Sequence, residues 1–255
     1  MVEGGCRIYG RSMPSSLTRS YGRCVGLLLL VAWAAGCEAP PPAAGEKARP
    51  PVSVDVPDGG RTYPAGTARM VVLGDSLTAG LGVSPGEAFP ARLQAKLEMA
   101  GYELEVVNAG VSGDTSAGGW RRLDWSLDGE IAVLIVALGG NDGLRGLPVE
   151  ELKSNLDAII TTARDRGVEV LLAGMEAPPN FGQAYTDAFR STYDQLAEEH
   201  DVLFVPFLLE GVAGVPELNQ PDRIHPNARG AEQIADHLWP AVEAMARRVD
   251  ARPSP

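Results

Sequence analysis

The sequence predicts a single three-layer α/β/α domain that is built on a five-stranded parallel sheet. Short apolar runs alternate five times with stretches in which apolar residues recur at helical spacing. This alternation is typical of a parallel sheet that carries helices on both faces. The predicted strands are residues 70–73, 104–107, 131–138, 168–173 and 202–205.

Three of the helices are indicated by the positions of proline, glycine and apolar residues. Pro90 and Pro148 each open a helix, and Gly167 ends the second one. A third helix lies near the C-terminus. The apolar stripes that should face the sheet are Phe89, Leu93 and Leu97; Leu152, Leu156, Ile159 and Ala163; and Ala231, Ile234, Leu238, Val242 and Met245.

Residues 1–36 have the pattern of a signal peptide. Arg19 and Arg23 precede an apolar run at residues 25–35, which is too short to span a bilayer comfortably. Small residues then lead to Cys37. We interpret this segment as a lipoprotein-type signal, after which the cysteine becomes the lipidated first residue of the mature chain.

The mature chain is expected to begin with a tether. Residues 37–68 are rich in proline and alanine and show no helical or strand period, so the predicted hydrolase domain spans residues 69–250. The three cysteines of the chain are Cys6, Cys24 and Cys37. The folded domain therefore contains no cysteine and can form no internal disulfide.

The charge of the chain argues against one class of partner. The formal net charge is −11, and removing the first 36 residues, with four arginines and one glutamate, leaves −14. Nucleic acid is an unsuitable partner for such an acidic protein. We expect a lipid anchor to hold it at a bacterial membrane, facing the periplasm. Ala34 stands where lipoprotein signals usually carry leucine, which leaves a soluble periplasmic or secreted protein as the alternative.

A serine stands where the first predicted strand gives way to a helix. Residues 74–80 read GDSLTAG and follow directly on the apolar run at residues 70–73. A turn of this kind exposes the Ser76 hydroxyl at the sheet edge, as a nucleophile requires. The alternative role for this serine is that of a helix cap.

Three further blocks supply the other parts of an acyl-transfer site. Residues 108–115 (NAGVSGDT) and 139–142 (GGND) each follow a predicted strand, so they should lie at the same sheet edge as Ser76. Near the C-terminus, Asp222 stands three residues before His225. A serine, a base and an orienting carboxylate are thus all present.

These four blocks resemble the SGNH (GDSL) hydrolase family, which is named for a Ser, a Gly, an Asn and a His in four separated blocks. The resemblance runs from about residue 69 to about residue 246. Residues 112–116 (SGDTS) and 139–146 (GGNDGLRG) look most like the bacterial thioesterase I/lysophospholipase L1 and arylesterase branch. The resemblance implies a flavodoxin-like strand order, 2-1-3-4-5.

The resemblance also implies a role for each block residue. Ser76 would attack the acyl carbonyl, His225 would accept its proton, and Asp222 would orient the imidazole. An oxyanion hole would consist of the Ser76 and Gly113 N–H groups and the side-chain amide of Asn141.

The residues beside this set have simpler interpretations. Asp75, Asp114 and Asp142 each adjoin a block residue, and we expect them to fix the loops by accepting hydrogen bonds. The alternative for His225 is an exposed loop residue ahead of a helix that Asn227 caps.

An apolar groove beside the loop after the fourth strand is expected to take the acyl group. Pro178, Pro179 and Phe181 would form one wall of this groove. Leu144 and Leu147 would form the other wall.

No cofactor and no metal ion are expected. His200 ends a polar helix terminus and His237 lies inside the last helix, so we interpret both as structural; the three histidines of the chain show no H-x-x-x-H spacing.

The sequence therefore predicts a metal-independent serine hydrolase that cleaves carboxylic esters or thioesters through an acyl-enzyme. The expected substrates are small acyl esters, thioesters or lysophospholipids, as for an arylesterase, a thioesterase or a lysophospholipase. The alternatives are an O-deacetylase of envelope polysaccharide and a non-catalytic binding lipoprotein of the envelope. We expect the protein to be a monomer.

Overall fold

The computed structural model describes residues 66–251 of the chain. The predicted signal peptide, Cys37 and nearly all of the predicted tether lie outside the described residues, so these interpretations stay predictions. Within the described part, the first strand begins at Arg69 and the last helix ends at Asp250.

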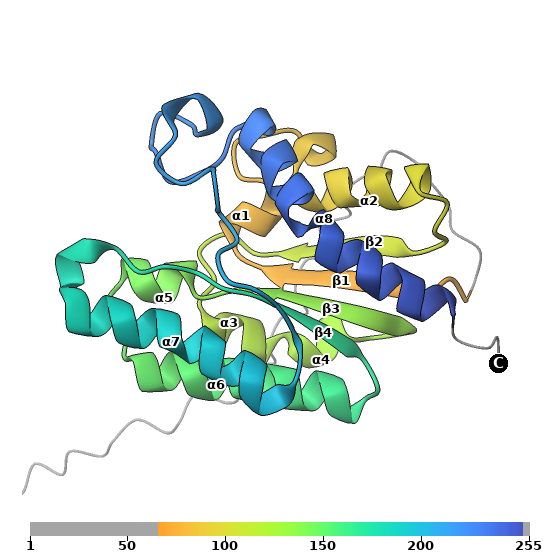
Figure 1. Ribbon diagram of the computed structural model, residues 1–255, viewed down its shortest axis with the longest axis horizontal. Helices are drawn as coiled ribbons and strands as arrows, with labels where there is room; N and C mark the ends of the chain where they lie inside the picture. Colours follow the sequence, from red (N-terminus) through yellow and green to blue (C-terminus); the bar gives the residue numbers. More distant parts are fainter. Residues whose placement is uncertain (1–65, 252–255) are drawn as a thin grey trace, which may run out of the picture. The chain divides into compact units, whose positions relative to one another are not determined.

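A five-stranded parallel sheet forms the middle layer of the fold (Figure 1). Its strand order is β2-β1-β3-β4-β5, which confirms the order that the family resemblance implies. Gly74 pairs with both Gly110 and Ala137, so β1, β2 and β3 end side by side. The strands are β1 (Arg69–Gly74), β2 (Glu105–Gly110), β3 (Ile131–Ala137), β4 (Glu169–Ala173) and β5 (Leu203–Val205).

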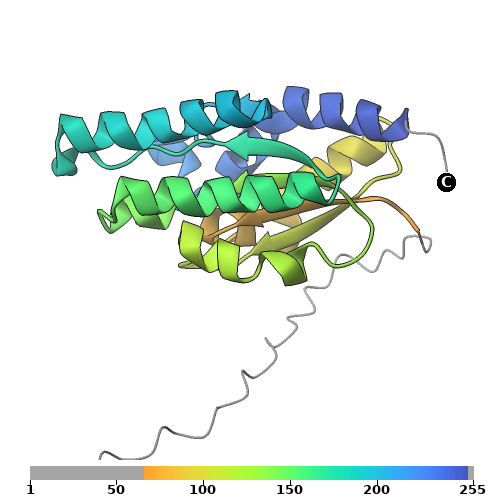
Figure 2. The same cartoon turned by 90° about the horizontal axis from the view of Figure 1, so that it is seen from below.

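Helices cover both faces of this sheet (Figures 1 and 2). Helices α2 and α8 pack together on one face, whereas α3, α6 and α7 pack together on the other. The helices are α1 (Ser76–Ala79), α2 (Phe89–Met99), α3 (Ser116–Arg121), α4 (Leu123–Ser126), α5 (Gly140–Leu144), α6 (Val149–Asp165), α7 (Gln183–His200) and α8 (Ala228–Asp250). Three short 3₁₀ turns are η1 (Pro85–Glu87), η2 (Pro179–Phe181) and η3 (Pro216–Leu218).

The predicted helix boundaries are confirmed. Pro90 is the second residue of α2, and α6 begins directly after Pro148. Gly167 follows the end of α6 with a φ of 75°, a left-handed conformation that glycine adopts without strain. The three predicted apolar stripes are buried.

The end predicted for the second strand is wrong. Strand β2 continues through Asn108 to Gly110, where the sequence favours a loop because of the polar residue. The side chain of Asn108 is satisfied locally, because its Nδ2 donates to the Thr78 carbonyl at 2.8 Å and its Oδ1 accepts from the Gly110 N–H at 3.0 Å. These bonds allow an asparagine to stand in the edge strand.

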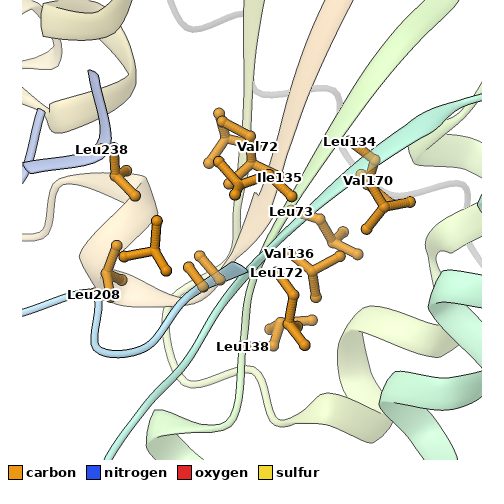
Figure 3. Close-up of a cluster of buried hydrophobic side chains, with 14 of the residues drawn as sticks. Val72, Leu73, Leu134, Ile135, Val136, Leu138, Val170, Leu172, Leu208 and Leu238 are labelled. Atoms are coloured by element: carbon orange, nitrogen blue, oxygen red, sulfur yellow. The ribbon is translucent and has the colours of Figure 1, made fainter. Parts of the chain in front are cut away.

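The core lies between the sheet and its helices, with β3 at the centre. Every residue of β3 after Ile131 is buried. Because helices cover both faces, this strand is a continuous apolar run and does not alternate with polar residues. Figure 3 shows the cluster, in which side chains of β1, β3 and β4 lie near Leu208 and Leu238.

Helix α1 approaches the strand ends so closely that two glycines are required there. A Cβ atom at Gly74 would lie 1.9 Å from Thr78 Oγ1, and one at Gly110 would lie 2.2 Å from the backbone nitrogen of Ala79. Real Cβ atoms do not come this close, so larger residues would push α1 away from the sheet. The close approach places Ser76, the first residue of α1, directly at the carboxyl edge of the sheet.

Candidate active site

The turn from β1 to α1 leaves the Ser76 hydroxyl available. Asp75 caps the helix, because its Oδ1 accepts a hydrogen bond from the Leu77 N–H at 3.0 Å. The alternative in which Ser76 is the cap is therefore wrong. Ser76 Oγ lies 2.9 Å from Nε2 of His225, a residue 149 positions later in the chain.

The histidine is oriented by a carboxylate from its own loop. Asp222 Oδ2 lies 2.7 Å from His225 Nδ1, and Asp222 Oδ1 accepts from the N–H groups of Ile224 and His225 at 3.0 Å. The hydrogen bond with the imidazole, followed by these two backbone bonds, lowers the pKa of Asp222 to about 2. This carboxylate is therefore ionised at neutral pH. Asn227 caps α8 directly after this loop, as expected.

The structure thus brings Ser76, His225 and Asp222 into one hydrogen-bonded line. The distance between the hydroxyl oxygen and the imidazole nitrogen is within the range that proton transfer requires. The side chain of His225 is 19% exposed, so its imidazole is not simply a solvated loop group.

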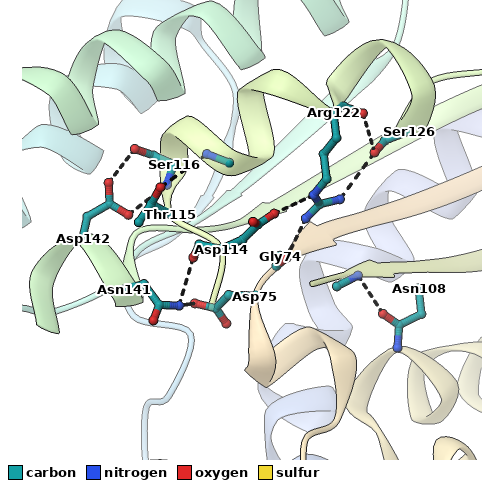
Figure 4. A network of polar contacts seen from close by, with 12 residues as sticks. Gly74, Asp75, Asn108, Asp114, Thr115, Ser116, Arg122, Ser126, Asn141 and Asp142 are labelled. Carbon is teal, nitrogen blue, oxygen red and sulfur yellow. Dashed lines mark hydrogen bonds and ion pairs between the residues drawn. The ribbon is translucent and has the colours of Figure 1, made fainter. Parts of the chain in front are cut away.

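The loop after β2 carries Gly113 and is held from two sides. Gly113 has a φ of 85°, and its carbonyl accepts from Arg145 Nη2 at 2.9 Å. The next residue, Asp114, forms an ion pair with Arg122, whose Nε lies 2.7 Å from Asp114 Oδ2 (Figure 4). The same guanidinium donates from Nη2 to the Gly74 carbonyl at 2.8 Å, which ties the loop to the end of β1.

Neither Arg122 nor Arg145 was among the residues predicted from the sequence. Arg122 and Gly74 are 48 positions apart, and Arg145 and Gly113 are 32 positions apart, so only the fold brings these groups together. Asp142 does act as expected, because its two carboxylate oxygens accept from the N–H and the hydroxyl of Ser116 at 2.8 and 2.6 Å.

Asn141 joins the loops that follow β1, β2 and β3. Its Nδ2 donates to Asp75 Oδ2 at 3.2 Å and to the Asp114 carbonyl at 2.9 Å (Figure 4). A side-chain amide has two hydrogens, so both have an acceptor inside the protein. An oxyanion that accepted a hydrogen bond from this amide would have to share or replace one of these two bonds. The bond to Asp75 is the longer of the two.

Asp75 is a buried acid beside the serine, with 2% of its surface exposed. Burial raises its pKa to about 6, although the Leu77 N–H, the Asn141 amide and the nearby His225 each oppose this increase. The carboxylate is therefore the dominant form at neutral pH, and it loses its charge in mildly acidic solution.

The segments predicted to form two walls of an acyl groove contact each other directly. Tyr185 donates its hydroxyl hydrogen to the Leu147 carbonyl at 2.8 Å. The ring of Phe181 covers Gly146, where a Cβ would lie 2.5 Å from Phe181 Cε1. The two segments thus form one joined surface, and Leu144 and Phe181 remain 47% and 40% exposed on it. Pro178 is half-buried and Pro179 is exposed.

The other two histidines contact groups outside this site. His200 Nε2 lies 2.7 Å from Asp157 Oδ1, and His237 Nε2 lies 3.0 Å from the Phe207 carbonyl. Between residues 66 and 251, no group of three or more His, Cys, Asp and Glu side chains is placed to hold a metal ion. No helix in that same range is long and apolar enough to cross a membrane.

The raised pKa of Asp75 gives a testable dependence of stability on pH. The folded protein keeps this proton up to about pH 6, whereas an unfolded chain releases it near the ordinary value of 3.8. Between these values the folded state binds more protons, so stability should fall as the pH rises. The unfolding free energy of the wild type, minus that of Asp75→Asn, should decrease by up to about 3 kcal/mol from pH 4 to pH 7 in urea titrations. A difference that stays constant with pH would contradict the raised pKa.

Comparison with known proteins places the chain in a family. Residues 72–233 match the GDSL-like Lipase/Acylhydrolase family. Esterase TesA of Pseudomonas aeruginosa is 41% identical over 185 residues, which cover 72% of this chain and 92% of TesA. The thioesterase 1/protease 1/lysophospholipase L1 of Escherichia coli strain K12 is 40% identical over 177 residues, which cover 69% of this chain and 84% of that protein. A crystal structure of TesA matches with a TM-score of 0.67 and 41% identity, covering 70% of this chain and 99% of that one. The four sequence blocks, the strand order and these relatives together show that the chain belongs to the GDSL-like lipase/acylhydrolase family.

Proposed function

We propose that the protein is a serine esterase that cleaves carboxylic esters or thioesters through an acyl-enzyme. The observation that carries this proposal is the hydrogen-bonded line from Ser76 through His225 to Asp222. A nucleophile, a base and an ionised carboxylate in this order form the arrangement used for acyl transfer on several unrelated folds. The relatives named as an esterase and as a thioesterase support the same activity.

The reaction would proceed in two halves. Ser76 Oγ attacks the acyl carbon while His225 Nε2 takes the hydroxyl proton, and Asp222 stabilises the imidazolium that forms. The imidazolium then gives its proton to the departing alkoxide or thiolate, which leaves an acyl group on Ser76. In the second half, His225 takes a proton from water, the resulting hydroxide attacks the acyl-enzyme, and the carboxylic acid departs as Ser76 recovers its proton.

The negative charge of the tetrahedral intermediate would be held by the Ser76 and Gly113 N–H groups and by the Asn141 amide. The loop geometry supports this role, because Asn141 and Arg122 tie the loop of Gly113 to the turn of Ser76. The Asn141 amide would reach the oxyanion by sharing or replacing its longer bond, the one to Asp75 Oδ2, while its bond to the Asp114 carbonyl keeps the loops together.

An apolar acyl group fits the surroundings of this site. Exposed large apolar side chains stand on the segments that carry the site residues, and such side chains are a common feature of binding surfaces. They are Leu81, Val111, Leu144, Phe181 and Ile224. We therefore propose small acyl esters, thioesters or lysophospholipids as the substrate class, with Leu144, Pro178, Pro179 and Phe181 in contact with the acyl chain.

Removal of the nucleophile tests the mechanism. Ser76→Ala should lower kcat for a p-nitrophenyl ester at least about a thousandfold, because the remaining groups supply only weak catalysis. The melting temperature should stay nearly unchanged. A fluorophosphonate probe should label the wild type and the control Ser191→Ala, whose half-buried serine on α7 donates to the Ala188 carbonyl, but not Ser76→Ala. Labelling of Ser76→Ala at the wild-type rate would show that another residue is the nucleophile.

Removal of the Asn141 amide tests the oxyanion role. Asn141→Ala should lower kcat by about 10²–10³ with little change in KM, which is the effect of losing one oxyanion donor. Circular dichroism melting should be recorded in parallel, because the same amide also anchors Asp75 and the Asp114 loop. An increase in KM alone would make Asn141 a residue that binds the ground state.

We further propose that the mature protein is a monomer anchored in the bacterial cell envelope through lipid on Cys37. This cysteine follows three small residues at the end of the predicted signal. Full-length protein expressed in a bacterium should fractionate with membranes, whereas Cys37→Ser should lack lipid by mass spectrometry. Wild-type protein that is free in the periplasm with an unmodified N-terminus would instead indicate an ordinary secreted hydrolase.

A further inference from the structure

His225 and Asp222 belong to a tight loop that must be held against α1. An isolated bridge pairs Asn219 with Pro226, and the N–H of Gln220 donates to the His225 carbonyl at 2.8 Å. Because the acid and the base lie on the same loop, their mutual hydrogen bond orients the imidazole within the loop. It does not set the position of the loop relative to Ser76.

The side chain of Gln220 connects this loop to the segment that carries Ser76. Its Nε2 donates to the Leu81 carbonyl at 2.6 Å and to the Pro226 carbonyl at 3.0 Å. Leu81 lies just after α1, and its own N–H donates to the Ser76 carbonyl at 3.0 Å. The side-chain amide of Gln220 therefore links Pro226, the residue after His225, to the turn that begins with Ser76.

This bridge has little redundancy. Within residues 66–251, the hydrogen bonds between residues 76–88 and residues 219–227 are the Gln220 bond to Leu81 and the direct bond between Ser76 and His225. The direct bond is the one that the reaction must break and remake, so it cannot also serve as a fixed support during turnover.

The glycine at position 82 fits this arrangement. A Cβ at Gly82 would lie 2.1 Å from Gln220 Oε1, so the amide of Gln220 packs directly on the backbone there. The carboxamide is thus confined by the Leu81 and Pro226 carbonyls on its nitrogen and by Gly82 beside its oxygen.

We propose that Gln220 is a positioning residue, which keeps His225 within proton-transfer distance of Ser76. The inference rests on the proposed function, since it concerns the same serine and histidine. Proton transfer requires a separation of about 2.6–3.2 Å, and a misplacement of about 1 Å can cost on the order of 10²-fold in rate. Loss of the bridge should therefore reduce kcat, while the contacts that bind the acyl chain remain.

Gln220→Met is the direct test, because methionine has a similar length but donates no hydrogen bond. It should lower kcat for a p-nitrophenyl ester about 10- to 100-fold and change KM less than about twofold. The loss should be larger for an alkyl ester of the same acid, because an alkoxide needs a proton from His225 and p-nitrophenolate does not. Gln195→Met is the matched control, since Gln195 bonds Lys153 on the far helices α6 and α7.

A second pair of variants tests the bridge from its other side. Gly82→Ala should displace the Gln220 amide and lower kcat by a similar factor, with no further loss when it is combined with Gln220→Met. Gly82 and Gly101 have nearly equal φ values of 81° and 83°, but no atom of residues 66–251 lies within 4 Å of a Cβ at Gly101. Gly101→Ala should therefore lower the melting temperature through the same backbone strain. Its kcat should stay at the wild-type value.

The outcomes separate the inference from the proposed function. If the wild type reacts with neither ester nor fluorophosphonate, the proposed function is wrong. If the wild type is active and Gln220→Met keeps wild-type kcat on both esters, the positioning role is wrong. The role is also overturned if Gln220→Met lowers activity only through KM.

Discussion

The close packing of α1 against the ends of β1 and β2 is the constraint on which the site depends. Gly74 and Gly110 allow this approach because neither has a Cβ atom. This close packing leaves one buried polar group unsatisfied. The buried hydroxyl of Thr78 has no hydrogen-bond partner among the described residues. Helix α1 therefore packs at the sheet edge with the Thr78 hydroxyl left unsatisfied.

A partly buried ion pair holds the loop after β2 in place next to this helix. Asp114 and Arg122 form an ion pair whose side chains are mostly shielded from water, and the guanidinium also reaches the backbone of β1. Such a pair is costly to desolvate, but its geometry is satisfied on several sides, and removing one partner would leave an uncompensated charge. The ion pair therefore fixes the position of the loop more than it adds to the free energy of unfolding.

Asp75, the buried acid next to Ser76, also holds neighbouring loops together. Asp75 is ionised at neutral pH although burial opposes its charge, and its oxygens hold the Leu77 N–H and the Asn141 amide. The amide is in turn bonded to the Asp114 carbonyl. The loops after three adjacent strands are thereby joined through one asparagine.

The sequence by itself determined the strands, the main helices and the four blocks that carry Ser76, Gly113, Asn141 and His225. These features depend on apolar periodicity and local turn chemistry, which can be read over a few residues. The position of Asp222 three residues before His225 is local in the same sense, and the structure places the two in contact. Asp75 and not Ser76 caps α1, because only the three-dimensional turn decides which side chain reaches the Leu77 N–H. The contacts of Arg122, Arg145 and Gln220, and the joining of the two predicted groove walls, were decided by tertiary structure alone. The bonds of Arg122 to Gly74, of Arg145 to Gly113 and of Gln220 to Leu81 connect residues that are far apart in the chain, and these residues meet only because the sheet edge brings its loops together.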